Sequence, residues 1–137
     1  MLATEQKLLL IGKVEAQSGV PIKTIRYYEQ LGLIQASGRT KGGFRLFSQD
    51  ILHRLSFIKR SQSLGFSLQE IGQILQIHDQ GELPCRTVKQ KIQTKVREID
   101  KRIEQLQILK TELLSLVCRS VLSPNDQEDI ICPIIEK

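Results

Sequence analysis

The sequence predicts a mainly α-helical protein, with a small N-terminal domain followed by one long helix. Three observations support this fold class. The 137 residues include only six aromatic residues and no Trp, so the core must be mostly aliphatic, which suits helix packing. Apolar residues recur at helical spacing in the first half of the chain. From about residue 84 they recur every seven residues, which is typical of a coiled-coil helix.

Two short helices joined by a glycine turn come first. Apolar residues at helical spacing predict a helix over residues 11–18, which Gly19 ends. Pro21, a residue tolerated in the first helical turn, begins the next helix, over residues 22–30. The pattern is therefore that of a helix-turn-helix.

The second of these helices carries a cluster of basic and hydrogen-bonding side chains near its start. This composition is expected of a helix that enters the major groove of DNA, where its first turns face bases and phosphates. The candidate contacts are Lys23, Thr24, Arg26 and Tyr27. For Arg26 a bridge between helices is the alternative, and for Tyr27 a half-buried packing position.

Residues 38–47 read GRTKGGFRLF, a basic segment with a Gly-Gly turn and alternating residues after it. This pattern predicts a two-stranded ribbon, the wing of a winged helix. Residues at the tip of a ribbon pack against little of the core, so its basic side chains are expected to contact phosphate. The candidate contacts in the wing are Arg39, Lys41, Gly43 and Arg45.

Two more helices follow the wing. Asp50 lies at the start of a helix that is broken at Gly65. Ser67 and Glu70 have the spacing of a capping box, which predicts a short helix through about residue 75. His53 on the first of these helices and His78, in the linker beyond the second, lack neighbours at ligand spacing and are assigned to surface or packing roles.

A long helix is predicted from about residue 84 to 117. Three to four heptads favour a dimerising coiled coil over a lone surface helix. The apolar seam consists of Ile92, Ile99, Leu106 and Leu113, alternating with Val88, Val96 and Ile103. Beyond it, residues 122–126 predict a turn-forming loop and residues 130–135 an apolar closing segment.

Positive charge is concentrated in the first half of the chain. Residues 1–60 hold ten Lys and Arg against four Asp and Glu, whereas residues 61–137 hold ten against eleven. The basic surface therefore belongs to the N-terminal half, where double-stranded DNA is the expected anionic partner.

The sequence shows no nucleophile with a recognisable base, no phosphate-cradling glycine loop and no suggestive carboxylate pair, so an enzyme is not expected.

The expected location is the cytoplasm, with no membrane partner. The N-terminal residues lack a signal-peptide apolar region, and no stretch approaches the ~20 apolar residues of a membrane span. In a reducing compartment the three cysteines are expected as thiols or metal ligands, because an odd count fits a disulfide framework poorly.

Cys85 and Cys118 lie at opposite ends of the predicted long helix, and Cys132 lies in the tail beyond it. At about 1.5 Å rise per residue the two helix cysteines of one chain are about 50 Å apart, so they cannot share a ligand. An antiparallel dimer places Cys85 of one chain beside Cys118 and Cys132 of the other, which gives two equivalent three-thiolate sites. This geometry indicates a metal sensor.

The donor set favours soft ions. Three thiolates without a nearby histidine suit mercury, lead or cadmium better than a closed zinc site. Zinc would need a fourth ligand, for which Asp126, Glu128 or Asp129 is a candidate, although that acidic run is also typical of a solvated turn. Taken singly, each cysteine is better explained as an inert small hydrophobe, but the convergence of all three in an antiparallel dimer favours a set of metal ligands.

Four pieces of the first half together resemble the DNA-binding domain of MerR-family transcription regulators. They are TIRYYE at residues 24–29, GL at 32–33, GFRLF at 43–47 and LGF at 64–66. The resemblance is close over roughly residues 10–76 and looser over the long helix. Two departures stand out. Pro21 occupies a position where the family often has a Ser cap, and Phe44 and Phe47 replace frequent tyrosines, which removes two hydroxyls that could donate to phosphate.

The resemblance implies a homodimer of winged-helix domains held by an antiparallel coiled coil. Such regulators bind a palindrome in a promoter, and the effector makes them distort the DNA so that RNA polymerase engages both promoter elements. Cysteines matching Cys85, Cys118 and Cys132 place the chain nearest the heavy-metal branch. In that branch a Cys at the start of the dimerisation helix is typical of sensors of divalent ions. Copper(I) sensors have a residue there that does not bind metal.

The resemblance also bears on the ion. The ending CPII at residues 132–135 is most similar to mercury sensors, but the thirteen residues between Cys118 and Cys132 exceed the loop expected of them. We therefore expect an activator that responds to Hg(II), with Pb(II), Cd(II) or Zn(II) as alternatives. A thiol-based oxidant sensor and an effector-free architectural DNA-binding protein are the other interpretations.

The expected domains are residues 8–78 for DNA binding, 84–118 for dimerisation and 119–137 for the metal-binding loop and tail.

Overall fold

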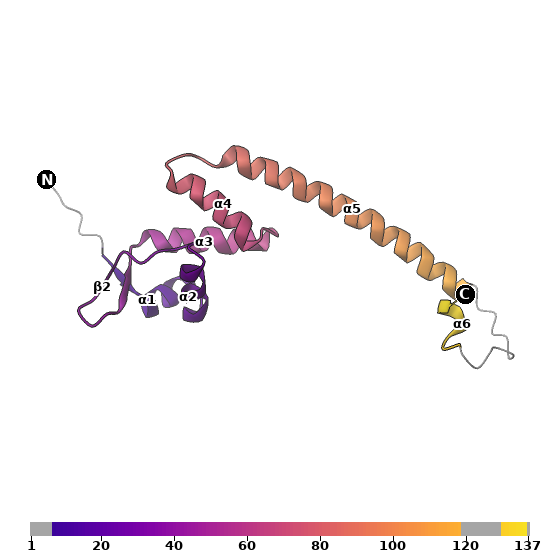
Figure 1. Ribbon diagram of the computed structural model, residues 1–137, viewed down its shortest axis with the longest axis horizontal. Coiled ribbons are helices and arrows are strands. Elements are labelled where there is room, and N and C mark those ends of the chain that lie inside the picture. Colours follow the sequence, from indigo (N-terminus) through magenta and orange to yellow (C-terminus); the bar gives the residue numbers. More distant parts are fainter. Residues whose placement is uncertain (1–6, 119–129, 137) are drawn as a thin grey trace. The chain divides into compact units, whose positions relative to one another are not determined.

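The computed structural model describes residues 7–118 and 130–136 (Figure 1). The chain divides after Arg86 into two compact units. The predicted fold class is confirmed, because the first unit is a mainly helical winged helix-turn-helix and the second is dominated by one long helix. Among the described residues, no helix is both long and apolar enough to cross a membrane.

The helix-turn-helix consists of α1 (Ile11–Ser18) and α2 (Ile22–Gln30), with the predicted bounds. Gly19 ends α1 in the left-handed region, at φ 75°, where glycine carries no Cβ penalty. Val14 of α1 and Ile25 of α2 are fully buried, so the two helices share one aliphatic core. The predicted bounds of both helices are therefore confirmed.

The wing belongs to a three-stranded antiparallel sheet. Its strands are β1 (Leu9–Leu10), β2 (Gly38–Arg39) and β3 (Arg45–Phe47), in the order β1-β3-β2. The ribbon of β2 and β3 was predicted, and β1 was missed. In the turn between β2 and β3, the Phe44 N–H donates to Thr40 Oγ1 at 3.1 Å, and Gly43 adopts φ 85°.

Two helices complete the core of the first unit: α3 (Asp50–Ser63) and α4 (Leu68–Asp79). The predicted capping box is present, because the Glu70 N–H donates to Ser67 Oγ and the Ser67 N–H donates to the Glu70 carboxylate. α4 continues four residues beyond the predicted end. His78 therefore lies in the last turn of α4, and its placement in the linker was wrong.

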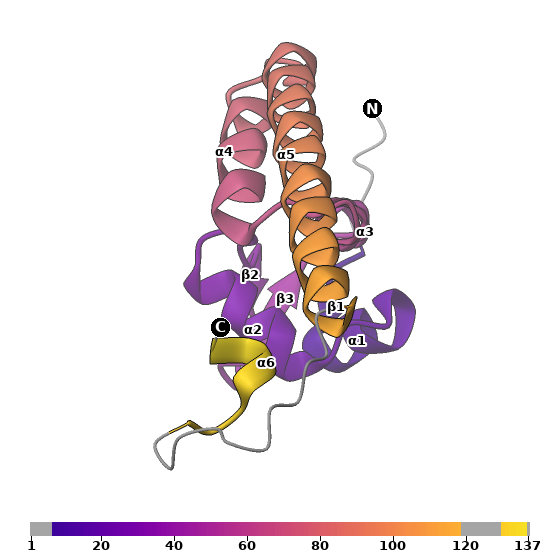
Figure 2. The ribbon, with the colours of Figure 1, turned by 90° about the vertical axis from the view of Figure 1, so that its right-hand side faces the viewer.

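The second unit contains most of α5 (Cys85–Cys118) and the short α6 (Pro133–Glu136). α5 is drawn as one continuous helix in Figure 2. It has 34 residues, and none of them is buried within the chain. Most of its apolar residues are exposed, although Val88 and Leu116 are half-buried. The exposed ones are Ile92, Val96, Ile99, Ile103, Leu106, Ile108, Leu109, Leu113, Leu114 and Val117.

Candidate DNA-binding surface and thiol positions

α2 presents its polar side chains to solvent because its apolar positions face the core. Ile25 and Tyr28, three residues apart, are buried on one side of the helix. Lys23, Arg26 and Tyr27 are exposed, whereas Thr24, also predicted to contact DNA, is half-buried. A polar outer face on the second helix of a helix-turn-helix is the arrangement that DNA recognition needs.

The described residues give Arg26 no bridge between helices, whereas Tyr27 combines a packing contact with partial exposure. Arg26 makes no side-chain hydrogen bond or ion pair within residues 7–118 and 130–136, so it does not bridge helices there. The Tyr27 side chain is 49% exposed, and its ring meets that of Tyr28 at a centroid distance of 6.4 Å. Both side chains are free to reach a partner.

Tyr28 fixes α2 to the domain. Its hydroxyl donates to Gln62 Oε1 in the last turn of α3 at 3.0 Å. Burial raises the pKa of Tyr28, and the hydrogen bond with Gln62 opposes that rise. Because the group stays protonated at neutral pH, this contact anchors the helix that carries the candidate base-reading side chains.

In the wing, Arg45 is held by α2. Its Nε lies 2.7 Å from Oε1 of Glu29, the residue before the end of α2. Arg45 also faces Arg39 directly across the β2-β3 pair, and like charges in that position destabilise a sheet. Glu29 offsets this repulsion, so the wing keeps two adjacent cations. The Arg45 side chain remains 40% exposed.

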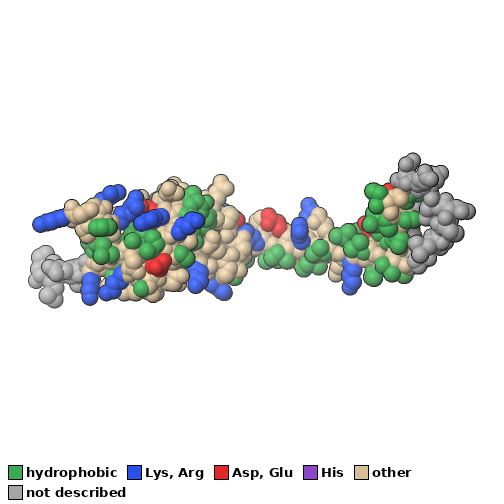
Figure 3. Space-filling view, turned by 90° about the horizontal axis from the view of Figure 1, so that it is seen from below, with side chains coloured by type: hydrophobic (Ala, Val, Ile, Leu, Met, Phe, Trp, Pro, Cys, Tyr) green, Lys and Arg blue, Asp and Glu red, His purple; other side chains and the backbone are tan. Residues whose placement is uncertain are grey.

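The other predicted wing residues are open to solvent. Arg39, Lys41 and Gly43 are exposed, at the end of β2 and in the turn that follows. Figure 3 shows Lys and Arg side chains over the N-terminal unit, in agreement with the charge distribution along the sequence. The structure thus brings the candidate phosphate contacts together in one basic ribbon.

The two wing phenylalanines differ in their surroundings. Phe44 is 69% exposed next to the ribbon turn, so the hydroxyl that a tyrosine would carry there is indeed lost from the surface. Phe47 is fully buried, with a relative exposure of 0%. The interpretation that its missing hydroxyl could have donated to phosphate is therefore wrong, because a ring in the core cannot reach DNA.

The three cysteines are free thiols on the described residues. Cys85 and Cys118, the first and last residues of α5, are exposed, and Cys132, directly before α6, is half-buried. The Cys132 N–H donates to Glu136 Oε2 at 2.9 Å, which ties this cysteine to α6. A continuous helix of this length spans about 50 Å, so its two terminal thiols are far apart.

Within the described part of one chain, no three His, Cys, Asp or Glu side chains gather as a metal site. The acidic candidates for a fourth ligand, Asp126, Glu128 and Asp129, lie outside the described residues, as does the predicted turn over residues 122–126. Because Cys85 and Cys118 lie at opposite ends of α5, a site that used all three thiols would need a second chain.

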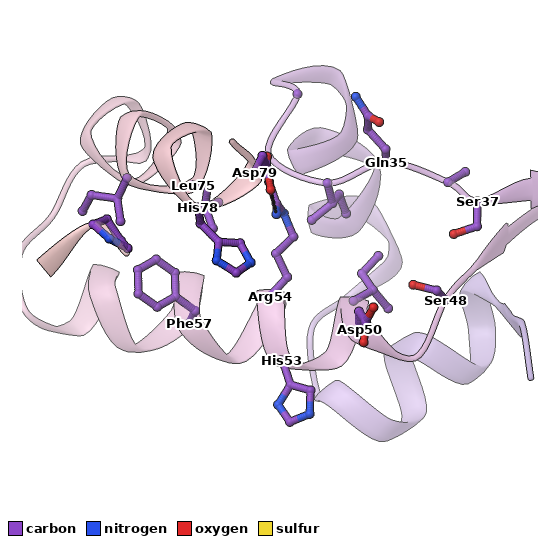
Figure 4. Close-up of a pocket in the computed structure, with 16 residues that line it drawn as sticks. Gln35, Ser37, Ser48, Asp50, His53, Arg54, Phe57, Leu75, His78 and Asp79 are labelled. Carbon is purple, nitrogen blue, oxygen red and sulfur yellow. Dashed lines mark hydrogen bonds and ion pairs between the residues drawn. The ribbon is translucent and has the colours of Figure 1, made fainter. Parts of the chain in front are cut away.

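A groove between α3 and α4 has Arg54 at its centre (Figure 4). The Arg54 guanidinium donates to Asp79 Oδ1 and Oδ2 at 2.7 and 2.8 Å, and its Nε donates to the carbonyl of Leu33. The hydrogen bond from Arg54 holds the pKa of Asp79 below its ordinary value. Arg54 thus joins α3, the end of α4 and the segment after α2, a role the sequence did not reveal.

Both histidines line this groove, although they are distant in sequence. Figure 4 shows His78 pointing into the space between α3 and α4 and His53 pointing away from it. The two histidines therefore do not form a pair of ligands, and their assignment to surface or packing positions stays unchanged.

A helix-turn-helix with a basic wing, followed by a helix whose apolar seam is exposed, defines a DNA-binding protein that dimerises. Comparison with known proteins gives the family. The model described as "MerR HTH family regulatory protein" matches residues 9–77, and that described as "MerR, DNA binding" matches residues 52–116. The chain belongs to the MerR family of transcription regulators, which are not enzymes. Regulators of this family bind promoter DNA as homodimers.

Similar proteins cover nearly the whole chain. The mercuric resistance operon regulatory protein of Bacillus cereus is 41% identical over 126 residues, 92% of this chain and 93% of that protein. The structure of the regulator MerR from Bacillus megaterium MB1 in complex with mercury(II) is 38% identical, with a TM-score of 0.59, covering 90% and 92%. PbrR691 from Ralstonia metallidurans CH34 in complex with lead(II) has a TM-score of 0.73 at 29% identity, covering 85% and 91%.

Proposed function

We propose that this chain is a metal-responsive transcription activator that works as a homodimer. In this proposal a thiophilic divalent ion, Hg(II) before Pb(II), Cd(II) or Zn(II), binds between subunits at Cys85, Cys118 and Cys132. The observation that carries it is the position of the thiols, two at the ends of one 34-residue helix and one in the segment beyond. Similarity to a mercury-responsive regulator and to metal-bound relatives supports the same function.

In this proposal each of three consecutive segments of the chain has its own role. Residues 8–78 bind promoter DNA, residues 84–118 form the antiparallel dimer, and residues 119–137 supply the metal-binding loop and tail. Metal binding stabilises a dimer conformation that bends and untwists the promoter, so that RNA polymerase engages both of its elements. The proposed DNA contacts are Lys23, Thr24, Arg26 and Tyr27 on α2, and Arg39, Lys41, Gly43 and Arg45 in the wing.

A competition titration of the purified, reduced dimer tests the metal response. We expect two Hg(II) ions per dimer, with a thiolate-to-metal charge-transfer band, binding more tightly than Pb(II), Cd(II), Zn(II) or Cu(I). Metal-dependent transcription from a bound promoter in vitro should follow the same order. A dimer that binds DNA, takes up no metal and gives no band would be an architectural protein instead. Loss of thiols to peroxide without metal uptake would indicate an oxidant sensor.

The wing makes a separate prediction. Arg45→Ala should weaken binding to all DNA sequences by a similar factor and reduce the slope of log K against log salt by about 1, as expected for one lost phosphate contact. Fluorescence anisotropy with operator and unrelated duplexes across a salt series measures both quantities. An unchanged slope would show that Arg45 does not contact the backbone.

Because Arg45 pairs with Glu29, its removal also leaves a carboxylate without its counter-charge. The double variant Glu29→Gln/Arg45→Ala separates the two effects. If the single variant binds weakly only through repulsion by Glu29, the double variant will bind like the wild type. As a contrast, Lys23→Ala should change the preference among operator variants, because the first turn of a recognition helix faces base edges.

A further inference from the structure

The recognition helix α2 lacks a cap of its own. Its N-cap residue, Pro21, has extended backbone angles, φ −59° and ψ 146°, and offers no side-chain acceptor. The first turn of α2 also contains no acidic residue. The first N–H groups of a helix have no partner within the helix, so an acceptor must come from elsewhere.

That acceptor comes from α1. Glu15 Oε2 accepts a hydrogen bond from the Ile22 N–H, the first of α2, at 2.7 Å in a partly buried position. The backbone carbonyl of the same residue accepts from the Gly19 N–H at 2.9 Å. Glu15 therefore accepts hydrogen bonds at both ends of the turn that joins the two helices, through its main-chain carbonyl at one end and its carboxylate at the other.

The charge of Glu15 matters as well as its geometry. The N-terminus of a helix carries a partial positive charge and readily binds anions, DNA phosphates included. A hydrogen bond from a backbone N–H to a carboxylate is short and strong, and 2.7 Å is typical of one. The carboxylate thus fills the anion-binding end of α2, beside Lys23 and Thr24.

We infer that Glu15 is a positioning residue for DNA recognition that also keeps phosphate away from the start of the recognition helix. It fixes the angle between α1 and α2 and lowers the attraction of α2 for the DNA backbone. The first turn of α2 is left to read base edges, so the ratio of operator to non-specific affinity rises. This inference rests on the proposed role of α2 in contacting DNA.

Two substitutions separate the cap from the charge. Glu15→Gln keeps an acceptor oxygen of the same reach and removes the charge, whereas Glu15→Ala removes both. The reduced, full-length dimer is used, with an operator selected by the wild type from a random duplex pool and with an unrelated duplex. Glu98→Gln on the exposed surface of α5 is the matched control, because it makes the same change in net charge in a different unit.

We expect Glu15→Gln to retain the melting temperature within the range of the control and to bind the unrelated duplex about three- to fivefold more tightly at low salt. Operator affinity should rise less, so specificity falls, and the differences should shrink at high salt. Glu15→Ala should melt at a lower temperature, and adding Pro21→Ser should restore it, because the serine hydroxyl supplies a local cap.

Equal binding by Glu15→Gln, its control and the wild type at every salt concentration would overturn the charge role. An unchanged melting temperature for Glu15→Ala would overturn the capping role. If the wild-type dimer binds neither duplex, the proposed function fails as well. By contrast, normal DNA binding by the wild type with no response to Glu15 refutes this inference alone.

Discussion

Mixing a Cys85→Ser homodimer with a Cys118→Ser/Cys132→Ser homodimer should restore about one three-thiolate metal site per heterodimer, although neither parent binds metal tightly. In the heterodimer, one end receives Cys85 from one chain and the other two thiols from its partner, and the opposite end receives none. The reason is the helix length of about 50 Å, which prevents one chain from supplying all three ligands. Metal stoichiometry and the charge-transfer spectrum after subunit exchange measure the result.

Both parents serve as controls, because each should bind operator DNA like the metal-free wild type. Exchange is verified by differently tagged subunits. A verified heterodimer that binds no metal would refute the inter-subunit site. The cysteines would then be assigned packing or redox roles. Full binding by either parent would show that fewer than three thiolates are enough.

Ile99→Glu should convert the dimer into a monomer and weaken operator binding at least about a hundredfold, equivalent to roughly 2.7 kcal/mol. Ile99 is 57% exposed in one chain and lies in the middle of the apolar seam of α5. A carboxylate buried there without a partner costs several kcal/mol. A monomer also loses the second half-site, on which dimeric helix-turn-helix proteins depend. Sedimentation equilibrium and anisotropy titrations measure the two effects.

Lys101→Glu is the matched control for this substitution. Lys101 is exposed two positions after Ile99, which places it on roughly the opposite side of the helix. The control changes the net charge more than Ile99→Glu does, so general repulsion of DNA would affect it more. A dimeric Ile99→Glu variant with normal operator affinity would exclude this face as the dimer seam.

The local features of the fold were predicted well because they depend on neighbouring residues. The helix-turn-helix bounds follow from Gly19 and from helical periodicity, and the start of α4 follows from the capping box of Ser67 and Glu70. β1 was missed because two residues are too few to show an alternating pattern, and it is defined only by pairing with β3.

The missed parts of the candidate site depend on contacts between elements distant in sequence. The exposure of Lys23, Arg26 and Tyr27 follows from the period of α2, so it was predictable. The pairing of Arg45 with Glu29 joins a strand to a helix, and Arg54 joins three segments. The only sign in the sequence that α2 takes its cap from another helix is Pro21, which occupies a position where the MerR family often has a Ser cap.

The exposure of α5 also has a thermodynamic consequence. A helix with no buried residue gains little from tertiary packing, which supplies most helical stability in proteins. In the proposed homodimer the second chain covers the apolar seam, so we expect folding of α5 and dimer formation to be linked equilibria. The midpoint of thermal unfolding should therefore rise with protein concentration. In a cell, the number of copies of the regulator would then help to set how much of it is folded and able to bind its promoter.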